Sequence, residues 1–374
     1  MAKVHITLVG GQPAPVYNGI VATAPEKVVY IYSTSSVRAL NALKNELDIP
    51  SSELELDVTS PRKIKVEVEK LAEKYKNDEV TVNISSGLKS WAFWFSVVFH
   101  GYANASVVYI DQNNVLWNYR TMESSDDFVF DMHTLFRLYG NPLENNYKKF
   151  TDYTKEDFEV IDLIEKIRSL NITDFNKLTT VLSNEQKHQV RNSKIGCFTC
   201  GESFVEWDKN NHSVKVGISK SGRIIEKVLN SPHVVDLIFN AGWFELKVAK
   251  LISGWKHAKE ICLNCRFPFK ENMDKNEVDI LVNTGVKILF VECKTQINTT
   301  TDIDKFRSVV KGYGGIGSKG LFVTNEPMKE LAITKCNDHG IITFSVKGEH
   351  FLGMETDQAL YWKLDNELLN INVK

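Results

Sequence analysis

The feature that most constrains the fold is a regular alternation of short apolar runs and amphipathic stretches over roughly the first 145 residues. The apolar runs predict strands, and the stretches between them have helical periodicity. Parallel pairing with helices on both faces of the sheet is typical of such alternation. We therefore expect a Rossmann-like α/β domain over residues 1–145. The predicted strands cover 4–9, 28–32, 53–58, 80–84 and 106–110, with helices over 35–47, from 61 onward and over 88–99.

Between residues 146 and 230 this alternation stops, and no repeat replaces it. The pattern predicts a helix starting near Thr154, a second helix over 171–190, and a hairpin over 203–218. The hairpin turn at 208–211 is rich in Asp and Asn, which is a common turn composition. We interpret 146–230 as a helical and hairpin connector.

The last part, residues 231–374, has the order helix, three strands, helix, strand, and predicts a second α/β domain. Its helices are expected over 232–253, 302–311 and 328–336, and its strands over 260–267, 277–283, 287–294, 320–324 and 341–346.

Two acidic residues of this last part are predicted to face each other across a hairpin. A turn over 283–286 pairs Asp279 with Glu292 to within about a residue. Lys294, two residues beyond Glu292, shares its strand face. Two converging carboxylates and the backbone carbonyl of Cys293 make an oxygen-rich site suited to Mg²⁺ or Mn²⁺. Glu245, on the preceding helix, is a candidate third acid.

The alternative for these residues is a structural ion pair. Two acids and a lysine on a strand as apolar as 288–291 are costly unless they are paired or bind a metal ion. A divalent ion would generate hydroxide and stabilise charge during phosphodiester hydrolysis, and Lys294 could orient the water. We therefore favour a metal-dependent nuclease with Asp279, Glu292, Lys294 and Glu245 as its catalytic residues.

Polar loops follow the first, second and fourth predicted strands, and strand ends are where doubly wound sheets bind ligands. Amides and hydroxyls at the start of a helix can hold phosphate, and a lysine there adds charge. Ordinary tight turns and a helix cap are the alternative interpretation. The candidate ligand-binding residues are Gly11, Gln12, Ser33, Thr34, Ser85, Ser86, Gly87 and Lys89.

The C-terminal pattern resembles the PD-(D/E)xK restriction-endonuclease-like superfamily. It consists of Glu245, then Asn276-Glu277-Val278-Asp279, then Val291-Glu292-Cys293-Lys294, on the predicted element order. The proline of the superfamily name is absent, because Val278 precedes Asp279. The resemblance implies that Asp279 and Glu292 bind metal and that Lys294 assists the attacking water.

The whole chain resembles the CARF-domain effector nucleases of type III CRISPR systems through its domain order and the strand-end loop Ser86-Gly87-Leu88-Lys89. The resemblance implies activation by a cyclic oligoadenylate, namely cyclic tetra-adenylate, bound across a two-fold homodimer. It also implies cleavage of single-stranded DNA or RNA, with nicking of duplex DNA as a further expectation, and a requirement for Mn²⁺ or Mg²⁺.

Composition sets wider limits. A formal charge of −2 excludes a wholly basic nucleic-acid binder but allows a local basic groove. No apolar run approaches the roughly 20 residues that span a bilayer, so no membrane association is expected. Six cysteines are few for 374 residues and favour a reducing, cytoplasmic setting. Two CxxC pairs, at 197–200 and 262–265, leave a structural zinc site as a minor alternative.

Two other functions stay open at this point. The first part could act as a ligand-responsive sensor that drives a non-catalytic DNA-binding connector, with the helices between 155 and 190 as its reading element. The chain could instead be a constitutive restriction or repair endonuclease with a scaffolding N-terminal domain. The joint presence of Asp279, Glu292 and Lys294 disfavours the non-catalytic regulator.

Overall fold

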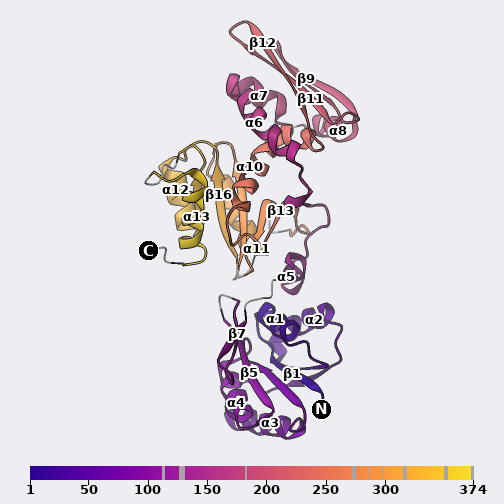
Figure 1. Ribbon diagram of the computed structural model, residues 1–374, viewed down its shortest axis with the longest axis vertical. Coiled ribbons are helices and arrows are strands. Elements are labelled where there is room, and N and C mark those ends of the chain that lie inside the picture. The colour runs from indigo at the N-terminus through magenta and orange to yellow at the C-terminus, as the bar shows by residue number, and fades with distance from the viewer. Residues whose placement is uncertain are drawn as a thin grey trace. The chain divides into compact units, whose positions relative to one another are not determined.

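The computed structural model describes residues 1–111, 114–125, 131–181, 183–271, 275–285, 287–297, 299–314, 318–348 and 353–371. The chain forms two compact units, Met1–Leu143 and Glu144–Lys374 (Figure 1). The predicted connector over 146–230 lies wholly within the second unit. Within the described ranges, no helix is both long enough and apolar enough to span a bilayer.

The first unit is built on one sheet with the strand order β3-β2-β1-β4-β5-β6-β7, in which the first five strands are parallel. The predicted parallel sheet is confirmed, and a short antiparallel hairpin, β6 and β7, extends its edge. The strands are β1 (Lys3–Leu8), β2 (Lys27–Tyr32), β3 (Ser51–Glu55), β4 (Glu79–Asn83), β5 (Ala105–Ile110), β6 (Leu116–Asn118) and β7 (Glu123–Ser125).

Helices cover both faces of this sheet. Strand β2 shows the division: Val29 and Ile31 pack toward α3 and α4, while Val28 and Tyr30 pack toward α1 and α2. Alternate residues of a strand point to opposite faces, so one apolar run supplies both cores. The helices are α1 (Pro13–Thr23), α2 (Val37–Glu46), α3 (Pro61–Lys74), α4 (Lys89–His100) and α5 (Met132–Leu138).

Helix α1 is absent from the sequence prediction. The segment Gly10-Gly11-Gln12-Pro13 predicts a break after the first strand, yet Pro13 is the first helical residue, where its missing N–H needs no partner. The turns of α1 that follow bury Val16 and Ile20 against the sheet.

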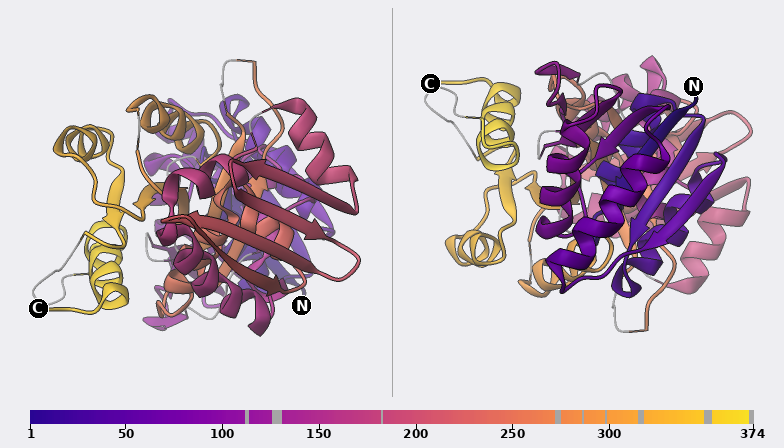
Figure 2. Two further views of the ribbon diagram at one scale, coloured as in Figure 1. Left: turned by 90° about the horizontal axis from the view of Figure 1, so that it is seen from above. Right: turned by 90° about the horizontal axis from the view of Figure 1, so that it is seen from below.

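The second unit begins with a short edge strand, helices and a four-stranded antiparallel sheet, whose strands lie side by side in Figure 2. The predicted hairpin over 203–218 is confirmed as its middle pair. The elements are β8 (Lys148–Lys149), α6 (Lys155–Leu170), α7 (Ile172–Thr179), α8 (Asn184–Asn192), β9 (Ile195–Cys200), β10 (Ser203–Asp208), β11 (Ser213–Lys220) and β12 (Arg223–Asn230).

The prediction of one helix over 171–190 is wrong. Helix α7 ends at Thr179, the next residue, Thr180, has extended backbone angles, and α8 begins anew after Ser183. The Ser183 hydroxyl accepts the N–H of Gln186, and the Gln186 side chain accepts the N–H of Ser183. This reciprocal cap starts a separate helix.

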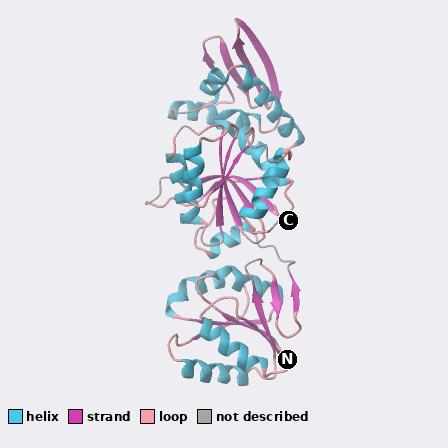
Figure 3. Cartoon of the chain, turned by 90° about the vertical axis from the view of Figure 1, so that its left-hand side faces the viewer, coloured by secondary structure: helices cyan, strands magenta, loops and turns pink. Residues whose placement is uncertain are grey.

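A mixed six-stranded sheet with the order β17-β16-β15-β14-β13-β8 forms the centre of the second unit. Figure 3 shows its strands with helices on both sides. Helices α10 and α13 pack on one face, and α11 packs on the other through contact between the rings of Phe306 and Phe322. The elements are β13 (Glu260–Arg266), β14 (Glu277–Asn283), β15 (Ile288–Lys294), α11 (Thr301–Tyr313), β16 (Ser318–Thr324), α12 (Glu330–Asp338), β17 (Ile342–Ser345) and α13 (Thr356–Glu367).

The helix predicted over 232–253 is broken into α9 (Val234–Ile238) and α10 (Gly242–Ser253). Asn240 and Ala241, between them, have positive φ angles of 54° and 65°. Left-handed residues cannot continue a right-handed helix, so α10 starts at a new angle. Glu245 therefore lies in the first turn of α10.

One hydrophobic core joins the connector to the central sheet. It includes Ile164 of α6, Trp207 of β10, Phe244 of α10, Val291 of β15 and Leu364 of α13. The connector over 146–230 and the α/β part over 231–374, which the sequence suggested as separate, therefore share one hydrophobic core.

Candidate active site

The candidate catalytic residues lie where β14 begins and β15 ends. The two strands are antiparallel, with Ile280 paired to Val291. Extending this register by one residue sets Asp279 opposite Glu292, as predicted from the hairpin. The backbone N–H of Cys293 donates a hydrogen bond to Asp279 Oδ2 at 2.7 Å, which fixes that carboxylate against β15.

Both carboxylates are buried and are balanced by lysines. Asp279 is 8% exposed and Glu292 only 2%. Lys294 Nζ lies 2.7 Å from Glu292 Oε1, so the predicted proximity of these two residues is present. Burying two acids this deeply is costly without compensating cations, which explains why lysines gather here.

A second lysine, Lys275, was not predicted to belong to the cluster. Its ammonium donates to both oxygens of Glu292, at 2.6 and 2.8 Å, and lies 3.8 Å from Asp279 Oδ1. Lys275 precedes β14 in a segment without periodicity. Lys275 lies four residues before Asp279 in the sequence. A prediction from strand alternation does not use this spacing, because Lys275 lies outside the strand.

The pKa shifts follow from burial and from these charges. Burial, and next the charge of Asp279, raise the pKa of Glu292, while Lys275 and Lys294 oppose the shift. Burial alone would lower the pKa of Lys294, but Asp279 and Glu292 outweigh it, so this pKa lies above its ordinary value. The pKa of Lys275 is also raised. Both lysines of the cluster therefore stay charged at neutral pH.

Glu245 is half-buried in the first turn of α10 and stands apart from the ion pairs of the described residues. Burial, and next the charge of Asp279, raise its pKa well above the ordinary value, while Lys294 opposes the shift. The raised pKa favours the protonated form of Glu245 relative to an exposed glutamate. Glu277, by contrast, forms an ion pair with Arg266 at 3.2 Å.

The donor set fits a hard divalent cation. Asp279 and Glu292 offer carboxylate oxygens, and Cys293 offers a backbone carbonyl beside them. Among the described residues, no cluster of three or more His, Cys, Asp or Glu side chains has metal-binding geometry. An ion here would therefore complete its coordination with water, as Mg²⁺ commonly does.

The strand end after Lys294 is held by the loop that follows β16. The backbone N–H of Asn325 donates to the carbonyl of Lys294 at 3.2 Å, and Glu326 donates in the same way to Thr295. The loop is thus bonded directly to the chain that carries the candidate catalytic lysine.

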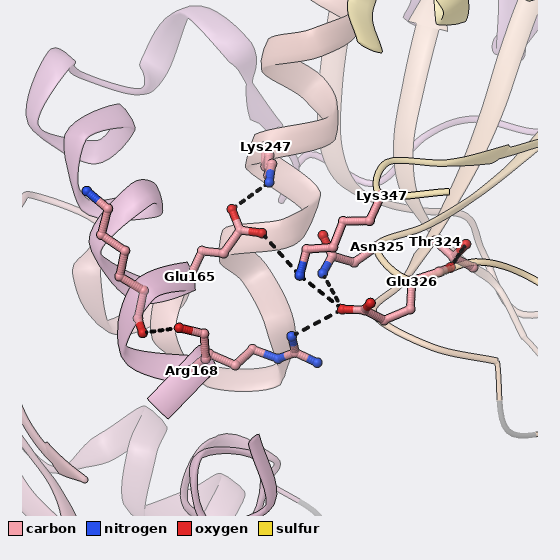
Figure 4. A network of polar contacts seen from close by, with 9 residues as sticks. Glu165, Arg168, Lys247, Thr324, Asn325, Glu326 and Lys347 are labelled. Atoms are coloured by element: carbon pink, nitrogen blue, oxygen red, sulfur yellow. Dashed lines mark hydrogen bonds and ion pairs between the residues drawn. The ribbon is translucent and has the colours of Figure 1, made fainter. Parts of the chain in front are cut away.

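Figure 4 shows the charged network around this loop. Lys347 Nζ lies 3.1 Å from Glu326 Oε1, and the buried Arg168 of α6 lies 3.9 Å from the same oxygen. Glu165 of α6 pairs with Lys247 of α10 at 2.6 Å. The network ties α6 and α10 to the β16 loop and so supports the position of Lys294.

In the first unit, the candidate ligand loops meet at the carboxyl edge of the sheet, because β1 lies between β2 and β4. The N–H of Gly10 donates to Ser86 Oγ at 3.1 Å. A Cβ on Gly10 would come within 2.6 Å of the Gly87 nitrogen, so the two loops are in tight contact. Gly87 has a φ of 79°, which favours glycine.

Several of the candidate polar groups already have protein partners. Ser85 Oγ accepts the N–H of Ile110 at 2.7 Å, and Gln12 Oε1 accepts the Tyr139 hydroxyl at 2.7 Å. Ser33 is buried, and its hydroxyl bonds that of Ser35 at 2.9 Å. Gly11, Thr34 and Lys89 are exposed. The structure places all eight candidates at one edge of the sheet, and their role in binding stays a prediction.

The two CxxC pairs lie in different sheets, on β9 and β13, and all four cysteines are free thiols. Burial raises the pKa of Cys265 well above its ordinary value. The described residues thus offer no zinc cluster at either pair.

No family model matches the sequence, and no curated protein is significantly similar to it. Solved structures are similar along nearly the whole chain. Can2 from Sulfobacillus thermosulfidooxidans in complex with cyclic tetra-adenylate is 18% identical, with a TM-score of 0.63 over 98% of this chain and 99% of Can2. The protein VC1899 from Vibrio cholerae is 16% identical, with a TM-score of 0.64 over 99% of this chain and 98% of VC1899.

A type III CRISPR defence DNA nuclease activated by cyclic oligoadenylate is also similar, at 16% identity and a TM-score of 0.58. The match covers 98% of this chain but 52% of that nuclease, so this chain spans about half of its length. These likenesses show that the chain shares the two-part α/β fold of these solved structures.

Proposed function

We propose that this protein is a metal-dependent nuclease of type III CRISPR antiviral defence that a cyclic oligoadenylate activates. The buried cluster of Asp279, Glu292 and Lys294 at the end of the central strands carries this proposal. Support for the activator comes from the fold shared with Can2, which was solved with cyclic tetra-adenylate. The proposed substrates are single-stranded DNA and RNA, with nicking of duplex DNA.

In the cleavage reaction, Asp279, Glu292 and the carbonyl of Cys293 would hold one Mn²⁺ or Mg²⁺. When bound, the ion would lower the pKa of its coordinated water and place a positive charge near the phosphate. Lys294 orients the attacking water and offsets the negative charge that develops on the phosphate oxygens. Glu245, with its raised pKa, can hold a proton for the leaving oxygen.

In the sensor, the loops at 10–12, 33–34 and 85–89 would contact the activator. A symmetric ring is recognised by two copies of one loop set across a two-fold axis, so we propose a homodimer. Helix α4 supports this arrangement, because Phe93 and Val97 are 58% and 51% exposed on it. Activator binding would shift the dimer toward a cutting-competent state, which requires different affinities for the two states.

The test is a fluorescent single-strand cleavage assay with Mn²⁺, with and without cyclic tetra-adenylate, together with calorimetric binding of the activator. We expect cutting only when the ion and the activator are both present. Glu292→Ala should abolish cutting and spare activator binding, whereas Lys89→Ala should weaken binding and lower cutting at moderate activator concentration. Equal loss of both activities in each variant would contradict this division between the units.

A further inference from the structure

A polar pocket of about 400 Å³ opens beside Glu245, and the cleavage chemistry described above does not use it. Its walls come from α8, α9 and the start of α10, and from the strands β13 and β14. Ligand pockets range from about 300 to 1,000 Å³, so this volume suits a small group such as one nucleoside.

The pocket is joined to the catalytic cluster through β14. Leu263 pairs with Ile280 and Cys265 pairs with Val278, so Asn264, which lines the pocket, lies on β13 between two residues whose partners flank Asp279 on β14. A strand whose phosphodiester lies at Asp279 therefore has its neighbouring nucleoside within reach of the pocket.

Three basic residues, Lys148, Arg191 and Arg266, and three acidic ones, Asp236, Glu245 and Glu277, line the pocket. Lys148 and Arg266 each have a carboxylate partner, Asp236 and Glu277. Arg191 of α8 is exposed, and the ion pairs of the described residues include none for it. Its charge is thus left to attract a phosphate of the substrate strand.

The remaining polar groups suit a base edge. The side-chain amides of Asn146 and Asn264 each offer both donors and acceptors, which single-stranded recognition uses on unstacked bases. Asn264 and Asn240 have positive φ angles of 55° and 54°. Asparagine adopts this left-handed conformation more readily than most residues other than glycine.

We propose that this pocket binds one unstacked nucleoside of the substrate strand, adjacent to the phosphodiester at the Asp279–Glu292 cluster. The proposal rests on the nuclease function proposed above. Entry into the pocket requires a base that is unstacked and unpaired, so a base within a duplex must first break its pair. The pocket thus selects single-stranded over duplex substrate.

The first experiment measures binding without cleavage. Fluorescence anisotropy of fluorescein-labelled oligothymidylate is recorded with the full-length protein in EDTA. Arg191→Glu should weaken binding about tenfold. Asn146→Trp, which fills the pocket mouth from an exposed position, should have a similar effect. The matched control is Arg223→Glu, because Arg223 of β12 is also exposed and lies outside the pocket; it should stay within about twofold of the unaltered protein.

The second experiment moves a single abasic nucleotide along the oligothymidylate in the cleavage assay. We expect cleavage at a given bond to fall when the abasic position is one particular neighbour of that bond, and Asn146→Trp should erase this dependence. If the unaltered protein cuts and Arg191→Glu binds like Arg223→Glu, the pocket proposal fails while the nuclease function stands. If nothing is cut but Arg191→Glu still weakens binding, the nuclease function fails and the pocket binds a strand for another purpose. Absence of oligothymidylate binding by the unaltered protein would overturn the pocket proposal.

Discussion

The candidate sites of the two units are held together by different forces. In the first unit, the loops around Gly10 and Ser86 meet through neutral hydrogen bonds and close backbone packing. In the second unit, Asp279 and Glu292 are buried acids whose charges are balanced by lysines. The candidate ligand site of the first unit should therefore be most sensitive to changes of shape, and the candidate cutting site of the second unit to changes of charge.

Titratable groups with shifted pKa values differ between the two units. Burial lowers the pKa of His5 in β1 to about 3, so the folded first unit keeps this histidine neutral. His5 should therefore destabilise the first unit as pH falls below 6.5. In the second unit, burial raises the pKa values of Glu245 and Glu292, whereas the pKa values of Asp157 and Asp304 are lowered, so these groups act on stability in opposite directions as pH changes.

The largest effect is expected from removing a charge at the cutting site. Lys294→Met should lower the cleavage rate by about 100- to 1000-fold, because a positioned positive charge near the scissile phosphate is lost. Lys275→Met removes the other lysine of the cluster and should cause a smaller loss. Single-turnover cleavage with Mn²⁺ and activator measures both. Unchanged cutting by Lys294→Met would show that this charge takes no part in the reaction.

A change of shape at the candidate ligand loops of the first unit should have an intermediate effect, on the stability of that unit. Gly10→Ala adds a methyl group within 2.6 Å of the Gly87 nitrogen, so the loops must separate, at a cost of about 1–3 kcal/mol. Gly11→Ala, one residue on, meets no atom within 4 Å and serves as the matched control. Calorimetric unfolding of the full chain should show one transition lowered by Gly10→Ala only. Equal shifts in both variants would contradict close packing at Gly10.

The smallest effect concerns pH. Between pH 6.5 and 5.5 the protonation of unfolded His5 should remove about 1 kcal/mol from the stability of the first unit. His5→Gln should flatten this dependence in the transition that Gly10→Ala identifies. His188→Gln, at an exposed position on α8, is the control. An unchanged pH slope in His5→Gln would assign the dependence to other groups.

Much of the fold could be predicted because local patterns and tertiary structure agree. The strands of the first sheet are apolar runs buried on both faces, and the register of Asp279 with Glu292 follows from one hairpin turn. Helix α1 was missed because Gly10-Gly11-Gln12-Pro13 suggested only a break after the first strand. Strand β12 was missed because nearly all its residues are exposed and give no alternation.

The catalytic cluster was only partly predictable. Periodicity identifies side chains on strands, and so it found Asp279, Glu292 and Lys294. Lys275 lies in the segment before β14, where no period applies, and its position depends on tertiary contacts with two acids. The pocket around Asn264 depends on a left-handed residue within a strand, which the sequence does not reveal.

The continuous core from α6 to α13 limits where this protein can exchange parts with others during evolution. A recombination junction near Leu143 would leave the interior of each compact unit intact. A junction near residue 230 would separate Trp207 and Ile164 from Phe244 and Val291, and would expose apolar surface on both fragments. A different first unit should therefore be acquired with the boundary at Leu143, while the connector and the candidate cutting site are inherited together.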